Sequence, residues 1–148
     1  MRGFKDFLME SQAEDEVQAT IAKMPKAYQK LVAGYKFKLE AGCTLKGSKT
    51  NVGMVRLDKK KEIHLAAPWR HSKEFVLLHE IGHLVFKKLC SEKWRKKWEK
   101  IARLTKQKQP KEELWCHNFA SYFAKNQIVS YGHPTWEKYM DAFVKETS

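Results

Sequence analysis

The stretch "VLLHEIGHLV", residues 76–85, places three ionisable side chains, His79, Glu80 and His83, in an otherwise apolar segment. Burying such groups without partners costs free energy, so we expect these three side chains to have binding partners or a functional role. The longer segment 73–89 is apolar nearly all round at helical spacing, which is typical of a helix in the centre of a domain. We therefore expect the rest of the chain to pack around this helix.

The spacing of these three residues matches the needs of a zinc site. Residues four apart lie one turn apart on the same helix face, so His79 and His83 can direct both imidazoles at one point. Imidazole nitrogen binds Zn²⁺ at about 2.0–2.1 Å. Glu80 is rotated by about 100° from His79 and lies beside such a metal without binding it, the place of a general base. The H-E-x-x-H pattern therefore predicts a zinc peptidase with Glu80 as its catalytic residue.

Two histidines leave a catalytic zinc site one protein ligand short. The metzincin arrangement needs a Gly and then a His soon after His83, and "HLVFKKLCSE" has neither at those places. A glutamate from a later helix is the other common solution, and Glu112 and Glu113 open one. Glu112 heads a bulky stripe, whereas Glu113 heads a stripe of small and polar side chains that suits close packing, namely Cys116, His117, Ala120 and Ala124. Spacing therefore favours Glu113 as the third ligand.

The remaining segments predict one α+β domain. Apolar residues recur at helical spacing in 14–24, 25–35, 91–105, 111–126 and 134–146. Apolar and polar residues alternate in three shorter runs, 35–42, 51–58 and 62–68. We expect a small, twisted, mainly antiparallel sheet, with residues 52–58 as the edge along which a peptide substrate adds. Gly82, inside the central helix, is expected to permit close approach by a neighbouring element.

Composition restricts the function less than the motif does. The chain has 148 residues, enough for one domain, and its 29 Lys and Arg against 17 Asp and Glu give a formal charge of +12. That charge predicts possible nonspecific association with DNA, although a solvated surface explains it equally. Three cysteines without a C-x-x-C pair favour a reducing, cytoplasmic location. No apolar run approaches the roughly 20 residues of a membrane span, and nothing in the sequence sets an oligomeric state.

Two motifs together resemble known zinc peptidases. "HEIGH" followed by "EELWCHNFASYFA" is similar to the gluzincin pattern of an H-E-x-x-H helix and a glutamate helix. The second motif resembles stretches of the anthrax-lethal-factor-like and the ImmA/IrrE-type peptidases, and "GHPTWEKYMDAF" is similar to the closing segment of the first group. The resemblance covers residues 25–145. It implies a zincin-like fold and a Zn²⁺ cofactor held by His79, His83 and Glu113.

The chain departs from these families at two positions. One turn after the ligand Glu, the families place a Glu or Asn that orients a zinc-bound His, where this chain has His117. His117 is expected to take that second-shell role, and an imidazole there could also be a ligand itself. The lethal-factor-like enzymes have a Tyr seven residues before the ligand Glu, where this chain has Lys106. The group that stabilises the oxyanion is therefore unassigned, with Tyr131 as one candidate.

The N-terminal segment "MRGFKDFLME", residues 1–10, resembles the capsid-targeting leader of internal head proteins of T-even-type phages. This resemblance implies cleavage before Ser11, a mature domain over 11–148, and a phage virion as a location before delivery to the host cytoplasm. The leading hypothesis is a zinc endopeptidase acting on a specific protein target. The alternative is a basic, nucleic-acid-associated or packaged structural protein whose metal site is not catalytic.

Overall fold

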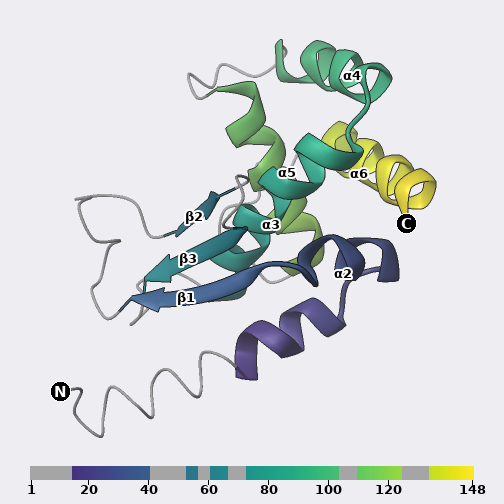
Figure 1. Cartoon of the computed structure of the whole chain (residues 1–148). Coiled ribbons are helices and arrows are strands. Elements are labelled where there is room, and N and C mark those ends of the chain that lie inside the picture. Colours follow the sequence, from purple (N-terminus) through teal and green to yellow (C-terminus); the bar gives the residue numbers. More distant parts are fainter. Residues whose placement is uncertain (1–14, 41–52, 57–60, 67–72, 104–109, 125–133) are drawn as a thin grey trace, which may run out of the picture.

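The computed structural model describes residues 15–40, 53–56, 61–66, 73–103, 110–124 and 134–148, and the fold is α+β (Figure 1). The predicted leader, residues 1–10, lies outside the described residues. Residues 15–22 are helical. The further elements, in chain order, are α2 (Lys26–Val32), β1 (Lys36–Glu40), β2 (Gly53–Arg56), β3 (Glu62–Ala66), α3 (Lys73–Leu89), α4 (Glu92–Arg103), α5 (Lys111–Ala124) and α6 (Pro134–Thr147).

The sheet is mixed, so the prediction of a mainly antiparallel sheet holds for only one of its two pairings. Strand order is β1-β3-β2, which makes β3 the central strand of the described sheet. β3 runs antiparallel to β2 but parallel to β1, with Lys36 opposite Glu62 and Glu40 opposite Ala66. The prediction failed because alternation identifies a strand and its buried face but does not identify the strand's neighbour.

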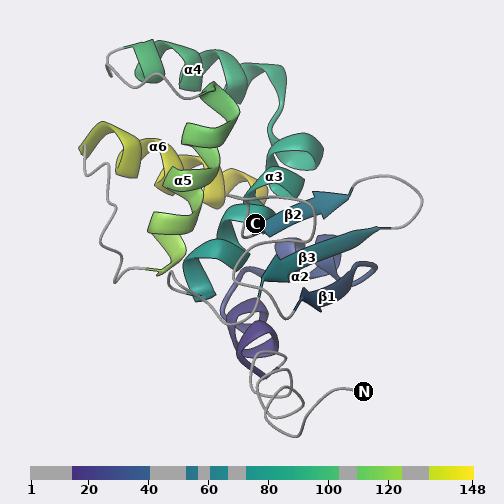
Figure 2. The ribbon, with the colours of Figure 1, turned by 90° about the vertical axis from the view of Figure 1, so that its left-hand side faces the viewer.

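Alternation along β3 decides which face of the sheet is buried. Ile63 and Leu65 are fully buried and belong to the same hydrophobic cluster as the apolar residues of α3. Glu62 and His64 point to the other face, where a Glu62 carboxylate oxygen lies 4.0 Å from Lys38 Nζ and 3.7 Å from His64 Nε2. The sheet therefore lies on one side of α3, and α4, α5 and α6 lie on the other (Figure 2).

α3 is the central helix that its sequence predicts. It begins at Lys73 and ends at Leu89, as expected, and its buried apolar residues cover more than half of the helix circumference, with the half-buried His79 and His83 on the remaining side. Gly82 meets α5, since a Cβ there would lie 3.2 Å from Cδ1 of Phe119 and 3.3 Å from Cα of Cys116. The expectation that Gly82 permits a close approach is confirmed, and the small-residue stripe of α5 is part of that contact.

Aromatic side chains fill the interior between α4, α5 and α6. The cluster comprises Trp94, Trp98, Trp115, Trp136, Tyr139 and Phe143, all buried. Its polar atoms have partners: Trp115 Nε1 donates to Tyr139 Oη at 3.0 Å, and that hydroxyl donates to the Trp94 carbonyl, also at 3.0 Å. Trp94 and Trp98 thus lie on the apolar side of the helix predicted for residues 91–105. Among the described helices, none combines the length and the apolar character that crossing a bilayer would require.

Candidate metal centre

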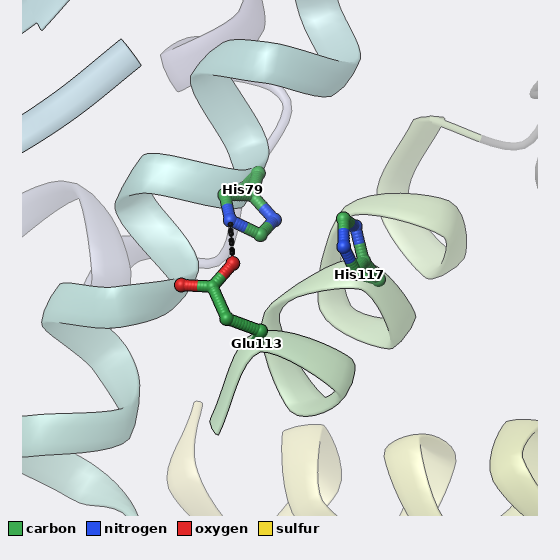
Figure 3. Close-up of side chains that lie close together, drawn as sticks. All are labelled: His79, Glu113 and His117. Atoms are coloured by element: carbon green, nitrogen blue, oxygen red, sulfur yellow. Dashed lines mark hydrogen bonds and ion pairs between the residues drawn. The ribbon is translucent and has the colours of Figure 1, made fainter. Parts of the chain in front are cut away.

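Two histidines of α3 converge on one carboxylate of α5. His79 Nε2 lies 3.0 Å from Oε2 of Glu113, and His83 Nε2 lies 3.0 Å from Oε1 of the same side chain. The Glu113 carboxylate therefore points between the two imidazoles, and its contact with His79 is visible in Figure 3. The structure thus brings together three residues that the sequence analysis named as metal ligands.

His117 stands one helical turn beyond Glu113 on α5 and also faces His79 (Figure 3). The two imidazole rings lie 4.6 Å apart between centroids and are tilted by 42°. On its other side, the His117 ring stacks against Phe75 at 5.9 Å and 16°. Donor atoms of His79, Glu113 and His117 all lie within 4.8 Å of one another, and these three residues could hold a metal ion.

The group that could hold a metal ion, His79, Glu113 and His117, combines imidazole nitrogen with carboxylate oxygen. In a tetrahedral site with ligands about 2.0–2.1 Å from the metal, neighbouring donor atoms lie about 3.3 Å apart. The two 3.0 Å separations between imidazole nitrogen and Glu113 oxygen are already close to that spacing. Nitrogen and carboxylate oxygen are both ligands that zinc accepts, and a cation between them would balance the carboxylate charge.

His79 and His117 are held in the neutral form that can bind metal. Burial lowers the pKa of His79 to about 3, and the neighbouring His117 and His83 add to that effect. Burial also lowers the pKa of His117, with a further contribution from His83 that the nearby Glu113 carboxylate opposes. Because only the neutral imidazole offers a lone pair to a metal, these shifts keep His79 and His117 available as ligands at neutral pH.

Glu80 is buried next to the candidate ligands. Only 7% of the residue is exposed, and burial raises the pKa of its carboxyl group to about 8, with a further contribution from the negative charge of Glu113. A cation at the site would oppose this shift, because it stabilises a nearby carboxylate. Glu80 is therefore a buried carboxyl group whose protonation state responds to its neighbours, as a general acid or base requires.

Glu112 also reaches the site, which the sequence analysis did not expect. Its Oε1 lies 3.6 Å from Nδ1 of His83, on the side of that ring away from Glu113. The sequence analysis assigned Glu112 to the bulky core stripe of α5, yet its side chain remains 33% exposed. The sequence feature that could have predicted this contact is the pair of adjacent glutamates, Glu112 and Glu113, in the first turn of a helix. Two residues there can flank a single side chain on a neighbouring helix.

Other candidates from the sequence lie elsewhere. His64 is on the sheet face beside Glu62. Lys106 and Tyr131, considered for stabilising an oxyanion, lie outside the described residues. Cys90 and Cys116 are free and buried, and burial raises the pKa of both thiols, so neither is an activated nucleophile.

Comparison of the chain with protein-family models, with curated proteins and with solved structures finds no match. The functional argument therefore depends on the site's own residues and geometry.

Proposed function

We propose that this protein is a zinc-dependent endopeptidase with a zincin-like fold. The observation that carries the proposal is the convergence of His79 and His83 on the two oxygens of Glu113, each at 3.0 Å. An H-E-x-x-H pattern occurring by chance would not place a carboxylate from a distant part of the chain against both imidazoles. The mixed sheet beside α3 and the glutamate helix α5 are the parts that such a fold needs.

In this proposal His79, His83 and Glu113 hold Zn²⁺, and His117 supports His79 through the contact between their rings. When bound, zinc supplies a Lewis acid that polarises the scissile carbonyl and lowers the pKa of a water molecule. The donors come from two helices that Gly82 holds close together, so their positions are set by rigid packing and not by a loop.

Glu80 is the proposed proton carrier. It follows His79 directly on α3, so its side chain leaves the helix about 100° from that of His79 and about 60° from that of His83, beside the ligands and not among them. Its carboxylate accepts the proton of the attacking water and then delivers it to the leaving amine. The site's burial favours this exchange, because it brings the pKa of Glu80 toward the neutral range in which such transfers are efficient.

The sheet edge supports a polypeptide as the substrate. β2 has a described partner, β3, along one edge, and α3 packs against β2. An extended peptide can pair with the opposite edge of such a strand and so be led past the ligand-bearing face of α3. We therefore propose that the substrate is a protein segment bound in an extended conformation.

The decisive test replaces Glu80 by Gln. We expect Glu80→Gln to keep zinc at wild-type stoichiometry and to lose about 10²–10⁴-fold in cleavage rate, since only proton transfer is removed. Elemental analysis measures the zinc stoichiometry. Mapping of new protein termini in a treated host lysate measures the cleavage. Glu74→Gln is the matched control, because Glu74 lies on the same helix but pairs with Lys23 at 3.8 Å. Unchanged cleavage by Glu80→Gln would rule out the mechanism.

A second candidate activity is association with a polyanion such as DNA. Exposed basic side chains occupy about 120° of the circumference of α4, opposite its buried tryptophans: Lys93, Lys96, Lys97, Lys100 and Arg103. They extend over about 15 Å of helix, a length that spans several phosphates. Three of them have intramolecular partners: Lys93 Nζ lies 2.8 Å from Glu146, Lys96 Nζ lies 3.3 Å from Glu92, and Lys97 Nζ lies 4.6 Å from the centroid of the Trp94 ring. Lys97 is exposed and forms no salt bridge among the described residues, so it can still contact phosphate together with Lys100 and Arg103.

DNA binding by the triple variant Lys97→Gln, Lys100→Gln, Arg103→Gln tests this activity. If these side chains contact phosphates, the slope of the logarithm of affinity against the logarithm of salt concentration falls by about three. The same triple change should leave proteolysis intact, which separates the two activities. An unchanged slope would show that α4 is a solvated face.

Delivery from a phage head is a further part of the proposal, and it depends on the leader resemblance of residues 1–10. Mass spectrometry of virions tests it, with a mature N-terminus at Ser11 as the expected result. Detection of the protein only in infected cells, with Met1 intact, would remove the delivery hypothesis and leave the peptidase proposal unaffected.

A further inference from the structure

The imidazole of His83 lies between two carboxylates that come from adjacent residues. Oε1 of Glu113 is 3.0 Å from Nε2, and Oε1 of Glu112 is 3.6 Å from Nδ1 on the other side of the ring. Both glutamates belong to the first turn of α5, so the start of this helix encloses one side chain of α3. The contact of His83 with Glu112 is the longer of the two.

The Glu112 oxygen lacks a donor. Although the Glu112 side chain is one-third exposed, its Oε1 is buried and accepts no hydrogen bond among the described residues. A buried carboxylate oxygen without a donor is destabilising. At 3.6 Å the facing Nδ1 of His83 is too distant for a hydrogen bond, for which about 2.7–3.2 Å is usual.

The position of one proton explains this gap. With Glu113 ionised, the 3.0 Å contact between Nε2 and the Glu113 oxygen is attractive when Nε2 carries the proton of the ring. A His83 ring with that single proton has a lone pair on Nδ1, and a lone pair facing a carboxylate oxygen gives no attraction. If Nε2 served as the metal-binding atom, the ring would carry its single proton on Nδ1, the nitrogen that faces Glu112.

We propose that Glu112 is the positioning residue of His83: it accepts a hydrogen bond from Nδ1–H once Nε2 binds the metal, which fixes the tautomer and the orientation of the ring. The proposal rests on the proposed zinc site. It assigns the role of orienting His83 to the residue before the ligand glutamate. Glu112 is then neither a ligand nor a surface acid.

Zinc affinity of purified, metal-depleted protein tests the proposal, with competition against a chelator as the measurement. We expect Glu112→Ala to bind zinc about 10–100-fold more weakly than wild type, as loss of a hydrogen bond to a metal-binding His does in other sites. Glu112→Gln keeps an oxygen acceptor and should retain most of the affinity. Glu137→Gln, an exposed glutamate in the first turn of α6, is the matched control and should bind as wild type does.

A spectroscopic readout separates positioning from mere structural support. In the zinc-loaded wild-type protein, proton–nitrogen NMR should show a hydrogen-bonded Nδ1–H of His83 that exchanges slowly with solvent. This signal should be lost or should exchange rapidly in Glu112→Ala, while the metal-free variants keep wild-type helical content.

Three results would overturn the proposal. Equal zinc affinity of Glu112→Ala and Glu137→Gln would show that Glu112 has no role at the site. Loss of zinc by Glu112→Gln as complete as by Glu113→Ala would make Glu112 a ligand. A wild-type protein that binds no zinc would remove the proposed function along with this inference, whereas in the first two cases the zinc site itself would stand.

Discussion

The two sides of α5 differ in the partners that their buried polar atoms have. Toward α4 and α6, the polar atoms of Trp94, Trp98, Trp115 and Tyr139 meet complementary ones, as where Trp98 Nε1 donates to the Lys111 carbonyl at 2.9 Å. Toward α3, groups of like kind are gathered: His79 lies against His83 and His117, and the carboxyl group of Glu80 lies near that of Glu113. The side toward α4 and α6 therefore contributes to stability, whereas the side toward α3 gathers the groups that could hold a cation.

This contrast teaches that a single helix can serve both purposes by presenting two stripes. Trp115 and Phe119 are fully buried, and their stacked rings, 5.5 Å apart, anchor α5 in the core. That anchoring holds Glu113 and His117 against α3, where the donor atoms of His79, Glu113 and His117 lie within 4.8 Å of one another. The predictions below test whether the two sides can be altered separately.

The largest expected effect is on the stable side. Phe143 of α6 is fully buried and contacts the rings of Trp94 and Trp115 at 5.5 and 5.2 Å. We expect Phe143→Ala to lower the free energy of unfolding by about 3–5 kcal/mol, because it leaves a cavity in the aromatic cluster. Urea titration measures this loss. Zinc affinity of the folded variant should stay at the wild-type value, and a large drop would show that the two sides are coupled.

The second prediction concerns the side of α5 that faces α3, where the candidate metal ligands lie. Glu113→Ala should weaken zinc binding by at least about a hundredfold, since it removes one of three proposed ligands and the only carboxylate among them. The stability of the metal-free protein should hardly change, because the Glu113 side chain is 40% exposed. Chelator competition and urea titration test both halves. A variant that keeps its zinc would exclude Glu113 as a ligand.

In the metal-free protein, the unfavourable burial of Glu80 should make the free energy of unfolding depend on pH. The folded pKa is raised to about 8 from 4.5, so between these values the unfolded chain releases a proton that the fold retains. The free energy of unfolding therefore falls as pH rises from about 4.5 to 8, and it shows no such loss below 4.5. Glu80→Gln removes the effect and should be more stable than wild type by about 3 kcal/mol at pH 7.

The check on this prediction is urea titration of both proteins in the presence of a chelator. At pH 4 the two should be equally stable, since the carboxyl group is then protonated in both the folded and unfolded states. An advantage for Gln that is equally large at pH 4 would show that the effect comes from packing and not from charge.

The smallest effect is expected at the contact between α3 and α5. Gly82→Ala gains about 1 kcal/mol of helix propensity but forces Phe119 and the Cys116 backbone to move, at a cost of about 1–3 kcal/mol. We expect a net loss of about 1 kcal/mol and several-fold weaker zinc binding, because the two ligand-bearing helices move apart. Gly34→Ala is the control, as its Cβ would meet nothing within 4 Å. Equal zinc affinity of both variants would show that the helix contact does not set the site.

Local pattern was sufficient for much of the fold. Periodicity gave α3 its bounds, and alternation along β3 indicated its buried residues, Ile63 and Leu65. These are properties that a segment carries by itself, because the buried face of a helix or strand follows from residue spacing alone. The parallel pairing of β1 with β3 could not be predicted in the same way, because it depends on which strands meet across the chain.

The same distinction between local spacing and contacts across the chain applies to the candidate site. The sequence by itself determined that His79 and His83 share a helix face, that Glu80 stands beside them, and that a glutamate at the start of a later helix suits the site, because these relations repeat within single helices. Only the tertiary structure decided that Glu113 meets both imidazoles, that His117 packs on the His79 ring, and that Glu112 flanks His83. Such contacts depend on how closely and at what rotation α3 and α5 pack, and that is set by Gly82 and the aromatic core together.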